Sequence, residues 1–148
     1  MSRNYSLINA TLFGFISALA GKLIISDYHG KNWEYLWIST GAAGFLTALL
    51  FSYVFIVLTK NYSNSRLILI GILIGVISHW THWYLLLSAQ SIRCFWSGEF
   101  SSSCPNPIEA FMGAVYLSGG SLIFLGWLAV PASIFSLMLS KRMALSCK

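Results

Sequence analysis

Four apolar stretches, each long enough to cross a lipid bilayer, dominate this sequence. A transmembrane helix needs about 20 apolar residues, and stretches that are apolar on every face do not fit the alternating strands of a membrane β-barrel. We therefore expect an all-α integral membrane protein, a four-transmembrane-helix bundle that forms a single domain over residues 1–148. The predicted helices cover residues 7–26, 35–59, 67–89 and 107–140.

The few charged residues predict the topology. They make up 9% of the chain, against roughly a quarter in soluble domains, and Lys and Arg in short loops stay on the cytoplasmic side. With four alternating helices, all four acidic residues fall on one side, and both termini are predicted to be cytoplasmic. Short loops and the lack of a recognisable targeting sequence favour a bacterial inner membrane. Six basic residues fall on the cytoplasmic side: Arg3, Lys60, Arg66, Lys141, Arg142 and Lys148.

The net charge of +5 is thus a topology signal, and we expect the lipid bilayer but no nucleic acid as a partner. A competing interpretation takes residues 1–20 as a signal peptide with a small-residue cleavage site. Cleavage there would leave three helices and would break the segregation of charge. We therefore favour four helices.

Two of the three cysteines are predicted to form a disulfide. Cys94 and Cys104 lie in the second predicted outer loop, whereas Cys147 lies in the cytoplasmic tail. Disulfides persist outside the reducing cytosol, and closing such a short loop stabilises a protein by about 2 to 3 kcal/mol. The alternative is a pair of free thiols in the loop.

Small residues recur at intervals of four in three of the predicted helices. Because apolar side chains gain little from contact with one another in lipid, close backbone approach at small residues holds membrane helices together. We call the helix faces that carry these small residues smooth faces. We expect them to pack against one another within one chain, or alternatively between the chains of an oligomer. The residues are Gly14, Ala18, Gly44, Ala48, Gly71 and Gly75.

The fourth predicted helix is too long for the membrane. Its 34 or so residues span about 50 Å, whereas the hydrocarbon core is about 30 Å thick. Asn106 and Glu109 form the pattern of a capping box at its start, and the glycine pair 119–120 and Pro131 are natural places to bend. We predict a kinked helix that projects from the outer face; in the alternative, residues 107–118 lie along the membrane surface.

Histidines within an apolar stretch are the candidate functional residues. An ionisable side chain at membrane depth is a functional candidate because leaving it in hydrocarbon is unfavourable. The rise per residue places His79, His82 and Lys22 in the outer third of the membrane, below Glu34 and Glu109. We predict an outward-facing polar pocket formed by these five residues. In the alternative, the histidines join helices by hydrogen bonds and Lys22 reaches the headgroups.

No catalytic set can be assembled from these residues, and too few metal ligands gather to hold zinc. We therefore predict a protein that is not an enzyme and has no cofactor or metal. The expected function is protein–protein interaction or self-assembly, with the outer loop bearing Phe95, Trp96 and Phe100 as the candidate partner-binding surface. In architecture the chain resembles toxin-immunity and phage-exclusion factors. The alternative is a small oligomeric channel or transporter whose path passes Lys22, His79 and His82.

Overall fold

The chain forms four long helices. A computed structural model describes residues 4–25, 36–60, 62–97 and 104–146. All four helices, with α2 continued by a π-helical turn, are long and apolar enough to cross a membrane, and this confirms the predicted all-α class. A helix suits such apolar sequence because it satisfies every backbone group internally. The elements are α1 (Asn4–Ile25), α2 (Leu36–Ser52) with η1 (Tyr53–Val57), α3 (Asn64–Ser97) and α4 (Pro107–Ser146).

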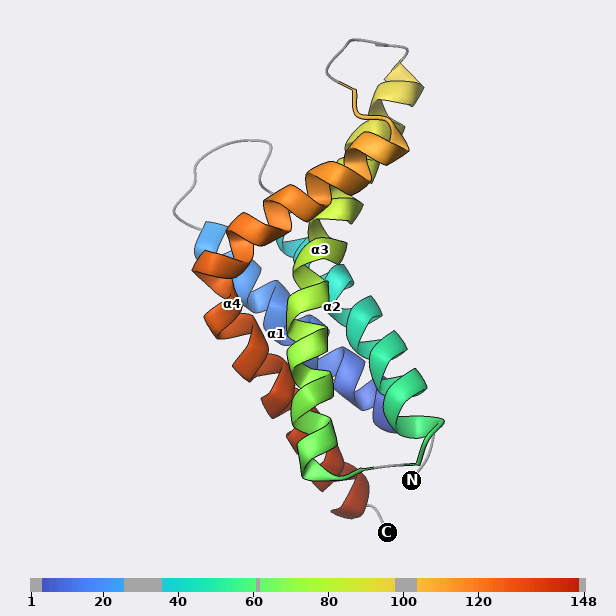
Figure 1. Cartoon of the computed structure of the whole chain (residues 1–148), viewed down its shortest axis with the longest axis vertical. Coiled ribbons are helices and arrows are strands. Elements are labelled where there is room, and N and C mark those ends of the chain that lie inside the picture. The colour runs from blue at the N-terminus through green and yellow to red at the C-terminus, as the bar shows by residue number, and fades with distance from the viewer. Residues whose placement is uncertain (1–3, 26–35, 61, 98–103, 147–148) are drawn as a thin grey trace.

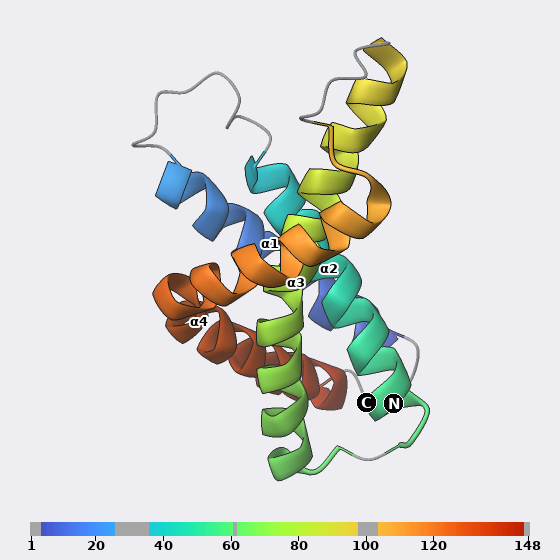
Figure 2. The same cartoon turned by 45° about the horizontal axis from the view of Figure 1, so that its top comes forward.

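The helices run alternately up and down, so that the N and C ends lie at the same end of the molecule (Figure 1). At the opposite end, α3 and α4 extend well beyond α1 and α2 (Figure 1). Turning the molecule by 45° shows the same extension, with α4 passing across α3 (Figure 2). The molecule therefore has a four-helix part near its termini and a two-helix extension at the other end.

Small residues bring the helices of each pair together. A Cβ atom added to Gly14 of α1 would lie 2.9 Å from the Cβ of Phe45 on α2. One added to Gly71 of α3 would lie 2.9 Å from the Cα of Ile134 on α4, and Gly75 is in equally close contact with Val130. These smooth faces are therefore used within the chain, between α1 and α2 and between α3 and α4.

The remaining small residues of this set occupy the same α1–α2 interface or the core. Gly44 lies against Ser17, and Ala18 lies against Gly41. Ala48 is fully buried in the apolar core.

Hydrogen bonds join α1 to α4 near the termini. The Tyr5 hydroxyl donates to the carbonyl oxygen of Leu137 over 3.1 Å. The Ser136 hydroxyl donates to Oδ1 of Asn9 over 2.8 Å. All four residues are buried, so the two helices are held side by side at this end.

The prediction that the third helix ends near residue 89 is wrong, because α3 continues to Ser97. The extra turns contain neither glycine nor proline, so nothing in the local sequence ends the helix earlier. They are also held from outside, since the Ser91 hydroxyl donates to the carbonyl of Pro105 over 2.6 Å. The fourth helix likewise runs past its predicted end, to Ser146.

The long helix α4 is bent. It has 40 residues, and it changes direction near its middle, in the deep orange part of Figure 1. Pro131 lies inside the helix and lacks the N–H that would bond to the carbonyl four residues before it. Before the bend, α4 packs along α3, where Phe111 contacts Trp80 edge-on. The first turns of α4 therefore belong to the same continuous helix as the rest of α4, and they pack against α3.

Candidate functional site

A cavity of about 310 Å³ lies between the four helices. Most of its wall is apolar and comes from the second half of α1 and the middle of α4. Helix α3 contributes the two histidines singled out from the sequence. Its polar lining residues are Ser17, Thr40, Ser78, His79, His82 and Ser121.

His82 joins α3 to the start of α2. Its Nδ1 lies 3.2 Å from the Ser39 hydroxyl and 3.3 Å from the Thr40 hydroxyl. Both hydroxyls donate to the carbonyl of Leu36, over 2.9 and 2.7 Å. Nδ1 of His82 is therefore held between two hydroxyl groups at the start of α2.

His79 joins α3 to α4 through Ser121. The Ser121 hydroxyl donates to the carbonyl of Ser118 over 3.1 Å and accepts from the indole N–H of Trp83, also over 3.1 Å. The same hydroxyl lies 3.1 Å from Nδ1 of His79. Nε2 of His79 is buried and has no hydrogen-bond partner in the described part of the chain.

Ser121 was not singled out from the sequence. The adjacent glycine pair suggested a bend, and the serine that follows it received no role. A serine in an apolar helix is a potential hydrogen-bond partner for another helix. The residue type of Ser121 was therefore a weak indication that it bonds to a neighbouring helix. Which helix it would meet depends on the packing of α4 against α3, which no local pattern specifies.

Two other members of the predicted polar pocket, Lys22 and Glu109, do not line the cavity. Lys22 is exposed and is not among the residues that line the cavity. Glu109 caps the start of α4, where its Oε2 accepts from the backbone N–H of Asn106 over 2.9 Å. Glu34 lies outside the described residues. The structure thus places His79 and His82 on the same cavity, whereas Lys22 and Glu109 are not among its lining residues.

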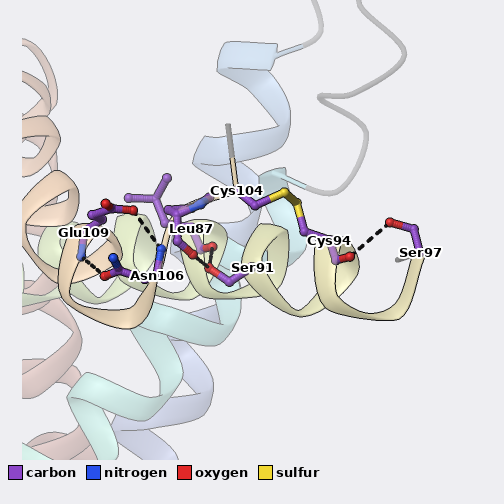
Figure 3. Close-up of a disulfide and its surroundings, with 8 residues drawn as sticks. Leu87, Ser91, Cys94, Ser97, Cys104, Asn106 and Glu109 are labelled. Atoms are coloured by element: carbon purple, nitrogen blue, oxygen red, sulfur yellow. Dashed lines mark hydrogen bonds between the residues drawn. A yellow bond between two sulfur atoms is a disulfide. The ribbon is translucent and has the colours of Figure 1, made fainter. Parts of the chain in front are cut away.

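The extension of α3 and α4 carries the disulfide between Cys94 and Cys104, whose Cα atoms are 6.0 Å apart. Figure 3 shows Cys94 within the last turns of α3 and Cys104 on the segment that leads into α4. The bond therefore fastens the start of α4 to the end of α3. Beside it, the Asn106 side chain accepts from the backbone N–H of Glu109 over 2.9 Å, completing the predicted capping box.

Two of the three predicted partner-binding residues lie on a helix instead of a loop. Phe95 and Trp96 belong to the last turns of α3, and their side chains are 68% and 84% exposed. Phe100 lies outside the described residues. Exposure this high for a tryptophan is unusual, because tryptophan is highly buried on average. The end of α3 therefore presents an apolar surface on a rigid support.

Within the described ranges, no three His, Cys, Asp or Glu residues come together in a way that could hold a metal ion. The chain matches no protein-family model, no curated protein and no solved structure. The candidate sites are therefore the cavity and the projecting end of α3 and α4.

Proposed function

We propose that this chain is a non-catalytic membrane protein that binds another protein at the projecting end of α3 and α4. The observation that carries the proposal is the difference in helix length. Helix α3 has 34 residues and α4 has 40, whereas α1 has 22. At about 1.5 Å per residue, α3 is about 51 Å long and α1 about 33 Å. A bilayer core of about 30 Å accommodates α1 but not α3.

The exposed aromatic residues of α3 are too far along the helix to rest in lipid. With Arg66 at the inner edge of the hydrocarbon core, the outer headgroups end about 37 Å away. Trp96 lies about 45 Å along the helix from Arg66, and the usual tilt of about 20° shortens this by a few ångströms. A membrane-interface role for this indole is therefore less favourable than contact with a protein.

The disulfide supports the same proposal. It fastens the end of α3 to the start of α4, so Trp96 is presented by a rigid support. A preorganised anchor loses little conformational entropy on binding, and tryptophan is enriched among the residues that dominate binding energy at interfaces. The expected partner has an apolar pocket that accepts an indole ring.

A photoreactive amino acid at position 96 tests the proposal in living cells. We expect a discrete crosslinked product that is heavier than the chain and absent when the same amino acid replaces Trp127. Trp127 is the matched control because it is also well exposed, at 72%, but lies in the membrane-spanning part of α4. Changing both Cys94 and Cys104 to serine should weaken the product severalfold.

Two results would contradict this proposal. A product of twice the chain mass of 16.4 kDa would identify a second copy as the partner. Equal, diffuse labelling from positions 96 and 127 would indicate lipid contact at both sites.

The channel or transporter alternative has less support. A path for ions or polar solutes needs polar walls, whereas the cavity is mostly apolar and Lys22 does not line it. The topology that accompanies our proposal has both termini in the cytoplasm of a bacterium. It is supported by the basic residues near the termini and by the position of both ends at one end of the bundle (Figure 1).

A further inference from the structure

A separate cavity lies at the end of the molecule that carries the C end of the chain (Figure 1). It has a volume of about 360 Å³ and lies between the start of α3 and the last turns of α4. It therefore combines apolar side chains with two basic ones. The lining residues are Asn64, Phe135, Met138, Leu139, Lys141 and Arg142.

The α4 residues of this cavity change from apolar to basic along the helix. Phe135, Leu139 and Arg142 are spaced by four and three residues, so they lie on one face of α4. Phe135 is 61% exposed, and it lies about 10 Å from Arg142 along the helix. This face therefore offers contact for hydrocarbon toward the middle of the bundle and positive charge at its end.

The ammonium group of Lys141 is held in place at the cavity. Its Nζ donates to the carbonyl oxygen of Tyr62 over 2.8 Å and to Oδ1 of Asn64 over 2.7 Å. An ammonium group has three N–H donors, so these two bonds leave one donor for a ligand. Both acceptors are uncharged oxygen atoms. The two bonds therefore position the charge without neutralising it.

The acidic side chains of the protein are remote from these two basic residues in the sequence. The acids are Asp27, Glu34, Glu99 and Glu109. The first three lie in the segments that connect α1 to α2 and α3 to α4. Glu109 caps the start of α4, about 50 Å along the helix from Arg142. Within the described part of the chain, no acidic side chain is therefore placed to balance the charge at the cavity.

We infer that this cavity binds the headgroup of an anionic phospholipid. The phosphate accepts hydrogen bonds from Lys141 and Arg142. An acyl chain lies along Phe135 and Leu139, toward the middle of the membrane. Basic pockets between transmembrane helices bind anionic headgroups in this way, whereas a free phosphate ion would leave the apolar face uncovered. The site rests on the membrane insertion proposed above, but not on the protein partner or on which end faces the cytoplasm.

Photocrosslinking of the full chain in lipid nanodiscs tests this site. Benzoylphenylalanine replaces Phe135, and the nanodiscs contain phosphatidylglycerol and phosphatidylcholine with the same acyl chains. Mass spectrometry of the crosslinked peptide gives the ratio of the two lipids. We expect phosphatidylglycerol to be enriched at least about fivefold over its share of the bilayer, since one basic residue near an anionic headgroup contributes about that factor. Inorganic phosphate, added at constant ionic strength, should leave the enrichment unchanged.

A second position and two charge variants serve as controls. Phe124 is another exposed phenylalanine of α4, at 74%, and it does not line this cavity. Benzoylphenylalanine at position 124 should give the two lipids in their bulk ratio. Arg142→Gln should lower the enrichment at position 135 about fivefold. Lys60→Gln removes an exposed charge near the start of α3, outside the cavity, and should not lower it.

The comparison of positions 135 and 124 needs no charge variant to fold. Equal enrichment at the two positions would overturn the site. An equal loss with Lys60→Gln and Arg142→Gln would overturn it in favour of diffuse attraction to the basic surface. Displacement by inorganic phosphate would overturn the lipid in favour of a free anion. The absence of lipid adducts at both positions would overturn membrane insertion together with the site, so the two failures are distinguishable.

Discussion

Gly71 and Gly75 are positions of close contact between α3 and α4. At Gly71, an added Cβ would meet not only the Ile134 side chain but also its Cα and backbone nitrogen, at 2.9 and 3.1 Å. Backbone atoms cannot rotate away as a side chain can, so the helices themselves must move apart. Interhelical van der Waals contact is a main source of stability in lipid, and these glycines therefore matter more than their size suggests.

We predict that Gly71→Ala destabilises the fold by about 1 to 3 kcal/mol, the usual cost of overpacking. Gly119→Ala is the control, because a Cβ there meets nothing within 4 Å. Alanine favours a helix over glycine by about 1 kcal/mol, so the control should be neutral or mildly stabilising. Equal destabilisation by the two changes, measured by unfolding in detergent, would refute this account of the interface.

The histidines show what single residues in a sequence can and cannot predict. Their type and depth made them candidates, and both line one cavity, although its wall is mostly apolar. Lys22 was grouped with them from its height alone, because rise along a helix gives depth but not direction. Whether a side chain faces the cavity or lies exposed depends on how each helix is rotated in the bundle, which packing determines.

Local sequence signals predicted one helix end well and another badly. The start of α4 was predicted in detail, since Asn106 accepts from the backbone N–H groups of Ile108 and Glu109 at 3.0 and 2.9 Å. The end of α3 was missed. It has no stop signal of its own, and its last turns are held by Pro105 and Cys104, which lie further along the chain.

Removing the cap should loosen the start of α4. Asn106→Ala leaves two backbone N–H groups without their partner, and the cost of such a loss is about 1 kcal/mol. We expect faster hydrogen exchange at the amides of Ile108 and Glu109, with the rest of α4 unaffected. Asn106→Asp retains the acceptor oxygen and should exchange at the original rate. Unchanged exchange in the alanine variant would show that the disulfide alone holds this turn.

The arrangement of the whole molecule follows from a simple alternation of four apolar helices. Helix number and approximate position could be read from the sequence because length and hydropathy decide them. The bend of α4 was expected from its excess length and from Pro131. The cavity was not expected in its observed form, because its lining comes from residues of all four helices. No single helix contains that information.

Surface labelling can test the proposed topology. In a cysteine-free background, Ile108→Cys places a thiol on a side chain that is 76% exposed, and Ser65→Cys places one in the first turn of α3. We expect a membrane-impermeant maleimide to label the first in intact cells and the second after permeabilisation. Fluorescent proteins fused to either terminus should both fold and fluoresce in the cytoplasm. Labelling of Ser65→Cys in intact cells would show that the topology is the reverse of the proposed one. The disulfide would then lie on the reducing, cytoplasmic side, where it is not expected to form.

If the proposed topology holds, the oxidation state of the disulfide at the far end of the bundle reports whether the chain has been inserted correctly. In the proposed topology, Cys94 and Cys104 leave the cytosol only when α3 and the beginning of α4 have been translocated together. A chain whose second hairpin stalls would keep both sulfurs as thiols in the reducing compartment. The oxidised fraction of the protein should therefore equal the fraction in which the second hairpin has crossed the bilayer.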